Sequence, residues 1–241
     1  MSSSGYLLIA DISGYTDFVK LHNLRKKAVV GKFLADNFEF HAEAIVSDLL
    51  EAVIEVVEPT LKLNKLEGDA AFFYYDVPHN EKYADKILEA MKSANKAFNE
   101  KASSLVFVQA CGCEPCLQSK NLRLKIVAHK GSYAIKKIRN FEELAGEDVI
   151  LTHRMLKNDI ESNEYWLVTD NFYNELNQEN KDKFTPNTQN IESFGKLKLN
   201  YLQLSSPEPK NSIVEKRSRI YNWFAQAAYF TKAKFGNKAS S

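Results

Sequence analysis

The sequence lacks an excess of charge of either sign and has no long apolar run. Its 241 residues include 32 lysines and arginines and 31 aspartates and glutamates, for a formal net charge of +1 at pH 7. This balance argues against nucleic acid as a partner, so any charged ligand must be recognised locally. The apolar run Tyr6–Ala10 ends at Asp11 and is too short for a signal or membrane segment. We therefore expect a cytoplasmic protein.

Cysteine is scarce, and the three cysteines lie close together. Cys111, Cys113 and Cys116 fall within six positions, which is not how a secreted disulfide framework is distributed. A reducing compartment fits better. The three thiolates can ligate zinc if a fourth ligand such as His129 or His153 joins them, but a second cysteine pair is missing. A loop of reduced thiols or a redox switch is the open alternative.

Several common catalytic motifs are absent as well. The sequence has no glycine-rich phosphate loop with a lysine, no dinucleotide-binding fingerprint and no serine nucleophile elbow. Its five histidines show no spacing typical of a nucleophile and its base. Hydrolase and oxidoreductase functions therefore lack support.

The apolar pattern of the first hundred residues predicts a central strand, a two-stranded hairpin and two helices. Tyr6–Ala10 is typical of a central strand buried on both faces, whose end points into a site. Helical spacing predicts one long helix from Asp17 to Ile54, with a break near Gly31 left open, and a second from Ala84 to Phe98. Residues 60–66 and 70–75 form a predicted hairpin around Glu67, Gly68 and Asp69.

The second half predicts another hairpin, a short helix and two edge strands. These comprise a hairpin of residues 122–129 and 133–138 that turns at Gly131, a helix from Val149 to Asn158, and edge strands at Tyr165–Thr169 and Leu197–Leu204. The order of elements predicts an α+β domain with a mostly antiparallel sheet and helices packed on one face.

We expect this single domain to span residues 1–205, with residues 206–241 as a C-terminal extension. From Lys216 to Lys238 the extension has the spacing of an amphipathic helix, which favours packing on its own domain or on a dimer partner. Contact with a membrane surface is the less favoured alternative.

Three segments resemble the class III nucleotidyl cyclase catalytic domain. They are Ala10–Thr16 (ADISGYT), Lys65–Asp69 (KLEGD) and Gly146–Met155 (GEDVILTHRM), and their order and spacing match as well as their letters. The match spans roughly residues 5 to 160 and looks most similar to an uncharacterised bacterial branch that carries a cysteine cluster. The resemblance implies a ferredoxin-like βαββαβ cyclase fold.

This resemblance implies that Asp11 and Asp69 bind two divalent ions, Mg²⁺ or Mn²⁺, with help from the backbone carbonyl of Ile12. Hard divalent ions prefer anionic oxygen ligands, so the assignment is chemically sensible. The alternative roles are a turn former at the strand end for Asp11 and an ordinary hairpin residue for Asp69. Gly14, Tyr15 and Thr16 lead into a helix, and their backbone donors can cradle phosphate oxygens of a nucleoside triphosphate.

The resemblance also assigns two base-contacting residues. Lys65 takes the position of a lysine that contacts the base in adenine-specific members, although it can instead extend from the hairpin end into solvent. Glu143 falls at the second base-selecting position, where glutamate departs from the usual residues. ATP is therefore the first candidate substrate, and the base stays open.

Arg154 matches the arginine that offsets charge on the phosphates during cyclisation. The asparagine that the family places one turn earlier is Ile150 here, and Asn158, one turn beyond Arg154, is the only candidate replacement. In the family the metal carboxylates come from one subunit and the base-selecting and arginine residues from the other, which implies a homodimer. The sequence thus leaves two main functions open: a nucleotidyl cyclase that works by two-metal catalysis, or a catalytically silent nucleotide-binding or regulatory module. A zinc- or redox-sensing protein centred on Cys111, Cys113 and Cys116 is a third, less favoured hypothesis.

Overall fold

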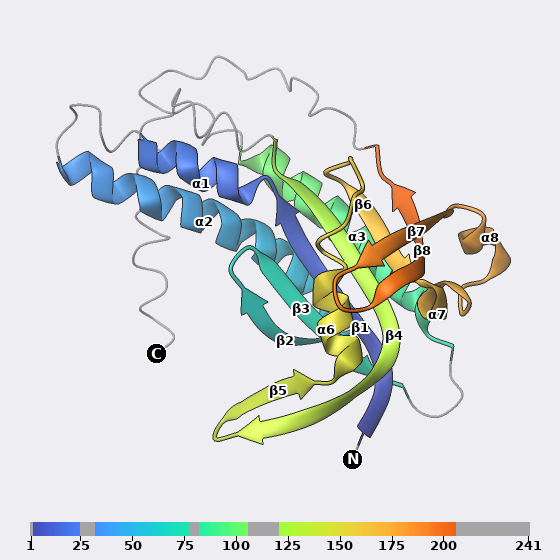
Figure 1. Ribbon diagram of the computed structural model, residues 1–241. Helices are drawn as coiled ribbons and strands as arrows, with labels where there is room; N and C mark the ends of the chain where they lie inside the picture. Colours follow the sequence, from blue (N-terminus) through green and yellow to red (C-terminus); the bar gives the residue numbers. More distant parts are fainter. Residues whose placement is uncertain (1, 25–31, 78–81, 106–120, 206–241) are drawn as a thin grey trace. The chain divides into compact units, whose positions relative to one another are not determined.

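The computed structural model describes residues 2–24, 32–77, 82–105 and 121–205. The chain forms two compact units. The first unit consists of Met1–Ser13, Val53–Ala97 and Arg123–Ser205, and the second of Gly14–Ala52, Phe98–Leu122 and Ser206–Ser241. The first unit contains the β-sheet (Figure 1).

The sheet is mostly antiparallel, as predicted. Within the described residues its strands follow the order β2-β3-β1-β4-β6-β8-β7, and β5 pairs with β4 beside this series. The only parallel pair among them is β4 with β6. The strands are β1 (Ser2–Ser13), β2 (Lys62–Glu67), β3 (Ala70–Asp76), β4 (Arg123–Ile138), β5 (Phe141–Ala145), β6 (Tyr165–Thr169), β7 (Thr185–Ile191) and β8 (Gly195–Gln203).

Strand β1 lies between β3 and β4, and its apolar segment Tyr6–Ala10 is fully buried, as the continuous apolar run predicted. Because side chains alternate along a strand, Leu7 and Ile9 face one side of the sheet and Tyr6 and Leu8 the other. Asp11 therefore lies on the same face as Leu7 and Ile9, at the end of the buried run.

Helix α6 (Glu147–Arg154) covers the face of the sheet to which Leu7 and Ile9 point. Its residues Val149 and Leu151 belong to the same buried cluster as these two side chains. Two very short helices, α7 (Asp170–Tyr173) and α8 (Gln178–Lys181), follow β6.

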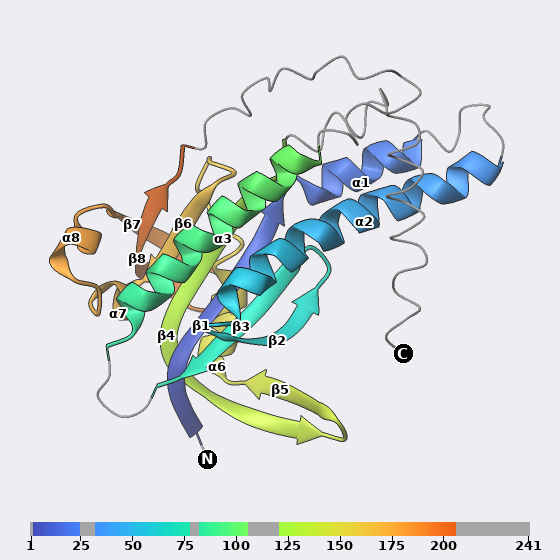
Figure 2. The same cartoon turned by 180° about the vertical axis from the view of Figure 1, so that it is seen from behind.

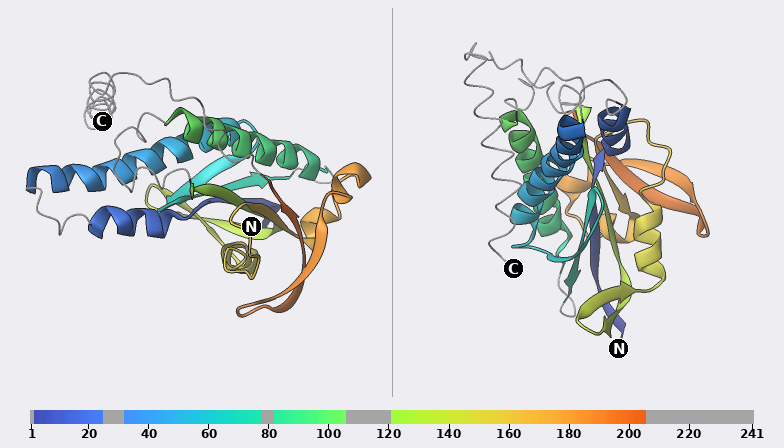
Figure 3. Two further views of the ribbon diagram at one scale, coloured as in Figure 1. Left: turned by 90° about the horizontal axis from the view of Figure 1, so that it is seen from above. Right: turned by 90° about the vertical axis from the view of Figure 1, so that its left-hand side faces the viewer.

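Helix α3 (Ala84–Ser104), of which residues up to Ala97 belong to the first unit, covers the opposite face. Its Asn95 accepts a hydrogen bond from Trp166 Nε1 (2.6 Å) and donates one to the carbonyl of Leu124 (3.2 Å). Figures 2 and 3 show α3 and α6 on opposite sides of the sheet. The predicted α+β fold is confirmed, but the predicted short helix, α6, packs on the face opposite α3 rather than on the same face.

The second unit contains α1 (Tyr15–Leu24), most of α2 (Lys32–Val57) and the end of α3. The predicted break near Gly31 falls among residues 25–31, which lie outside the described residues. Ile45 and Leu49 of α2 are buried, and Lys101 Nζ lies 3.4 Å from Asp48 Oδ2. In the described part of the chain, no helix has both the length and the apolar character needed to cross a membrane.

The predicted hairpin turn at Gly131 is wrong, because β4 runs without interruption from Arg123 to Ile138. A Cβ atom at Gly131 would lie 2.4 Å from both His129 Nε2 and Asp148 Oδ2. Glycine is needed here for close approach rather than for a turn. The chain turns instead at Arg139 and Asn140, between β4 and β5, where Arg139 has a φ of 56°.

The two predicted edge strands lie inside the sheet. β6 is buried along its whole length between β4 and β8, and β8 lies between β6 and β7. The edge strand on this side of the sheet is β7, which has the polar sequence TPNTQNI and a proline at position 186. Its lack of apolar alternation explains why the sequence did not predict it.

His129 is buried on β4, and its protonation is linked to folding. Its Nδ1 lies 2.8 Å from Thr169 Oγ1, and its Nε2 lies 3.1 Å from Asp148 Oδ1 without the geometry of a hydrogen bond. Burial lowers the pKa of His129, and the neighbouring carboxylate of Asp148 offsets this only in part. The folded protein thus favours neutral His129.

We expect the protein to lose stability as the pH falls below about 6.5, the pKa of an unperturbed histidine, because the unfolded chain then binds a proton that folded His129 does not. His129 contributes at most about 1.4 kcal/mol per pH unit until its lowered folded-state pKa is reached. The free energy of unfolding in denaturant should therefore fall less steeply with acid in the variant His129→Gln. Parallel pH profiles of the variant and the unchanged protein would contradict this role.

Candidate functional site

The end of β1 and the turn between β2 and β3 lie side by side. Asp11 pairs in register with Ala70, the first residue of β3, and the N–H of Ile12 donates a hydrogen bond to the carbonyl of Asp69 (3.1 Å). Gly68 permits the tight turn before Asp69, because its φ of 67° is a left-handed conformation. The structure thus brings Asp11, Ile12 and Asp69 together, as the sequence predicted.

The pKa of the Asp69 carboxyl group is affected by its burial and by the charge of Asp11. Asp69 is half-buried, and burial raises the pKa of its carboxyl group. The negative charge of Asp11 raises this pKa further, whereas a backbone hydrogen bond and the positive charge of Lys125 act in the opposite direction. Two carboxylates that repel one another in this way form a place where a cation is stabilising.

Lys125 is a charged neighbour of this pair that the sequence analysis did not single out. It lies on β4 directly opposite Asp11 in the register, and its Nζ is 3.0 Å from Asp11 Oδ2. The sequence shows only that Lys125 alternates with apolar residues. The pairing of β1 with β4, which no local pattern reveals, places it on the face of Asp11.

Lys65 and Glu143, the predicted base-contacting residues, form an ion pair. Lys65 Nζ lies 3.1 Å from Glu143 Oε2 and 3.1 Å from Glu67 Oε1. Burial acts to lower the pKa of Lys65, but the hydrogen bonds and charges of the two glutamates outweigh it, so the pKa is raised. The ammonium group is therefore held between two carboxylates.

Glu67 also connects this pair to helix α6. His153 Nε2 lies 2.9 Å from Glu67 Oε2, and His153 Nδ1 lies 2.8 Å from the carbonyl of Val149. Both ring nitrogens of His153 thus have partners within the chain. The predicted zinc cluster of Cys111, Cys113 and Cys116 lies outside the described residues.

Arg154 is the last residue of α6 and forms an ion pair with the carboxylate of Glu192. Ile150, one turn earlier, is 54% exposed. The helix ends at Arg154 rather than at Asn158, so the predicted shared helix face does not extend to Asn158.

Asn158 has a structural role that explains the early end of the helix. Its Nδ2 donates hydrogen bonds to the carbonyl of Met155 (2.8 Å) and to Tyr165 Oη (2.7 Å), and its Oδ1 accepts one from the N–H of Ile160 (3.0 Å). These bonds hold the turn after α6. Asn158 is therefore engaged within its own chain, which argues against the predicted substitution for the missing asparagine.

Gly14, Tyr15 and Thr16 belong to the second unit, at the start of α1. Gly14 has a φ of 90°, and its carbonyl accepts a hydrogen bond from the N–H of Phe18 (3.0 Å). The conformation fits the predicted turn from strand into helix.

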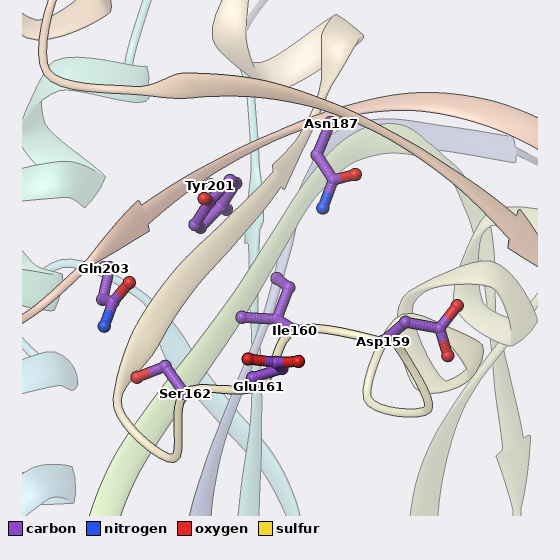
Figure 4. A pocket seen from close by; sticks show the side chains of 7 residues that line it. All are labelled: Asp159, Ile160, Glu161, Ser162, Asn187, Tyr201 and Gln203. Carbon is purple, nitrogen blue, oxygen red and sulfur yellow. The ribbon is translucent and has the colours of Figure 1, made fainter.

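A polar cavity of about 470 Å³ lies between the segment after α6 and the strands β7 and β8 (Figure 4). Its lining combines carboxylate, amide and hydroxyl groups with one apolar side chain: Asp159, Ile160, Glu161, Ser162, Asn187, Tyr201 and Gln203. None of these lining residues is among those predicted for metal or nucleotide.

Solved structures of class III cyclases share this fold. The adenylyl cyclase CyaB from P. aeruginosa is 14% identical, with a TM-score of 0.59 over 86% of this chain and 97% of that one. The guanylyl cyclase Cya2 is 12% identical, with a TM-score of 0.59 over 88% and 96%. A class III adenylyl cyclase-like ATP-binding protein from Pseudomonas aeruginosa is 19% identical, with a TM-score of 0.55 over 76% of this chain and 36% of that one.

Sequence comparison gives the family. The family model described as "Protein of unknown function (DUF2652)" matches residues 46–165. The uncharacterized protein Rv2561/Rv2562 of Mycobacterium tuberculosis is 34% identical over 163 residues, which are 68% of this chain and 75% of the relative. The chain therefore belongs to the DUF2652 family, and its fold is that of the class III nucleotidyl cyclases.

Proposed function

We propose that the protein is a nucleotidyl cyclase-like protein that binds a metal-bound nucleoside triphosphate and converts it to a 3′,5′-cyclic nucleotide and pyrophosphate. The observation that carries this proposal is the meeting of Asp11 and Asp69 at the end of β1, in a fold shared with class III cyclases. The likeness to a cyclase-like ATP-binding protein supports nucleotide binding as the first step.

The residues at the end of β1 fit a divalent ion such as Mg²⁺ or Mn²⁺. Carboxylate and carbonyl oxygens are the ligands that these hard ions prefer, and Asp11, Asp69 and the Ile12 carbonyl are the donors assigned here. Burial and, after it, the charge of Asp11 raise the pKa of Asp69, and a bound ion would offset the repulsion between the two carboxylates. When bound, it would stabilise charge on the triphosphate and acidify the attacking hydroxyl group.

The ion pair of Lys65 and Glu143 is the proposed base-recognition site. The ammonium group can donate a hydrogen bond to an acceptor on the base edge, and the carboxylate can accept one from a neighbouring donor. ATP stays the first candidate because of the lysine. Glu143 leaves the choice of base open, since several bases present an acceptor beside a donor.

In the proposed reaction the ribose 3′-oxygen forms a bond to the α-phosphorus. At the same time the bond between the α-phosphorus and the oxygen that bridges it to the β-phosphorus breaks. Pyrophosphate leaves with the bonding electrons, and the hydroxyl proton passes to solvent or to a carboxylate. The partner subunit's Arg154 would offset the phosphate charge after release from Glu192. Backbone donors of Gly14, Tyr15 and Thr16 would hold phosphate oxygens.

Exposed apolar side chains of the first unit support the homodimer that this reaction requires. Phe141 is 72% exposed beside the β4–β5 turn, and Ile138 across that turn is also exposed. Leu66 on β2 and Ile150 on α6 are exposed as well. Adjacent apolar side chains on a surface are typical of an interface between subunits, and Ile138 and Phe141 are such neighbours because they pair across the β4–β5 turn.

A second function, binding of the triphosphate without turnover, is favoured by α6. Exposed Ile150 cannot make the polar contact of the family asparagine, and Asn158 is bonded within its own chain. Arg154 is paired with Glu192. Experiments on Asp69 and Ile150 separate the two functions.

We expect Asp69→Asn to lower metal-dependent triphosphate binding and any cyclic product by about ten- to a thousandfold, because it removes a charged ligand. The protein would be incubated with Mn²⁺ and each of the four ribonucleoside triphosphates, with binding measured by equilibrium dialysis and products by chromatography. Asp182→Asn, at an exposed carboxylate after α8, is the matched control. Equal binding by the unchanged protein and Asp69→Asn would contradict the proposed site.

We expect Ile150→Asn to increase the rate of cyclic-product formation by about tenfold or more, because it restores a polar contact to the ribose or phosphate. Ile150→Ala is the control for loss of the apolar side chain alone. Metal-dependent binding without product in all three proteins would establish the silent module. An equally active Ile150→Ala would show that the gain does not come from the amide.

We expect Phe141→Glu to convert a dimer into a monomer, because it places a charge in a desolvated apolar contact. Molar mass from light scattering during size-exclusion chromatography measures this directly. Lys137→Glu changes the charge of the same hairpin without removing apolar surface and should stay dimeric. A monomeric unchanged protein, in the presence of metal and triphosphate, would rule out the two-subunit site.

A further inference from the structure

Lys125 is fixed beside Asp11 by the pairing of two strands. In the antiparallel register of β1 and β4, Asp11 stands directly opposite Lys125, so both side chains extend from the same face of the sheet. The Cβ atoms of such a pair lie about 4.5–5.5 Å apart, so long side chains can reach one another. The observed distance of 3.0 Å between Lys125 Nζ and Asp11 Oδ2 is a close ion pair.

The surroundings of this pair make it stronger than a surface contact. The Lys125 side chain is 21% exposed and that of Asp11 15%. Solvent and salt screen such partly buried charges less than exposed ones. Lys125 thus neutralises one of the two negative charges at the end of β1.

An ammonium group in this position competes with a metal ion for Asp11 Oδ2. The two carboxylates alone balance one divalent ion. With Lys125 in place, a single divalent ion already leaves the cluster with net positive charge, and a second ion would meet strong repulsion. The donor set therefore fits one ion, whereas the cyclase resemblance predicted two.

We propose that Lys125 is a resident cation that takes the place of one of the two divalent ions, so that each site binds a single ion. This inference rests on the proposed metal site at Asp11 and Asp69. Lys125 supplies, through a covalently fixed charge, part of the attraction for phosphate oxygens that a second ion would supply. It also holds the Asp11 carboxylate in position before any metal arrives.

The test is a titration of the full-length chain with Mn²⁺ alone, with free Mn²⁺ followed by electron paramagnetic resonance. We expect one Mn²⁺ per chain for the unchanged protein. Lys125→Met keeps the length of the side chain and removes its charge, so it should bind a second Mn²⁺ or bind the first at least about tenfold more tightly. Lys125→Arg keeps the charge and should behave like the unchanged protein.

Lys130→Met is the matched control, because Lys130 lies on the same strand and forms a comparable partly buried ion pair with Glu175 (2.7 Å). Its Mn²⁺ stoichiometry should not change. Melting temperature gives a second readout that confirms folding: Mn²⁺ should raise it more in Lys125→Met than in the unchanged protein. If Lys125→Met does not fold, Lys125→Gln serves in its place.

The outcomes separate this inference from the proposed function. Two ions on the unchanged chain, or one ion with no change in Lys125→Met, would overturn the role of Lys125 and leave the metal site standing. Binding of Mn²⁺ by Lys125→Met but not by the unchanged protein would show that Lys125 occupies the cation site. It would also refute the proposal that the unchanged protein binds a metal ion there. An absence of Mn²⁺ from every variant would refute both proposals.

Discussion

The position of β1 between β3 and β4 is the constraint on which the rest of the first unit depends. Its buried run holds the sheet together, and the residue that ends this run, Asp11, consequently has neighbours on both sides. The turn at Asp69 adjoins it through the Ile12 hydrogen bond, and Lys125 stands opposite it on β4. The pairings of β1 with β3 and with β4 therefore bring together two like charges and one opposite charge that are spread over more than a hundred positions of the sequence.

Local sequence patterns were sufficient to predict the strands, turns and helices whose conformation is determined by residues close together in the sequence. The apolar run of β1, the Gly-Asp turn between β2 and β3, and the helical spacing of α3 each gave the correct element. Gly131 misled the prediction, because glycine serves a turn and a close approach equally well. The edge strand β7 has no apolar alternation, since two of its three less exposed positions are the polar residues Asn187 and Gln189. Such features depend on neighbours from elsewhere in the chain.

The residues of the candidate site likewise fall into those that the sequence predicted and those that only the structure could place. The resemblance to cyclases pointed to Asp11 with Asp69 and to Lys65 with Glu143, and each pair meets in the structure. Lys125 could not be singled out, because a lysine between two apolar residues is an ordinary strand pattern until the register is known. Asn158 seemed available only while the helix was extended to it. Its own hydrogen bonds to Met155 and Tyr165 end that extension.

The absence of a side chain at Gly131 leaves a space that has a consequence for α6. The Asp148 carboxylate occupies this space, where it accepts a hydrogen bond from the N–H of Ser132 and lies beside His129. Asp148 is in the first turn of α6, so this contact anchors the helix to the middle of β4. A larger residue at position 131 would collide with Asp148 and displace α6 from the sheet, together with its residues Ile150 and Arg154. The positions of those two side chains thus depend on the absence of a side chain at Gly131.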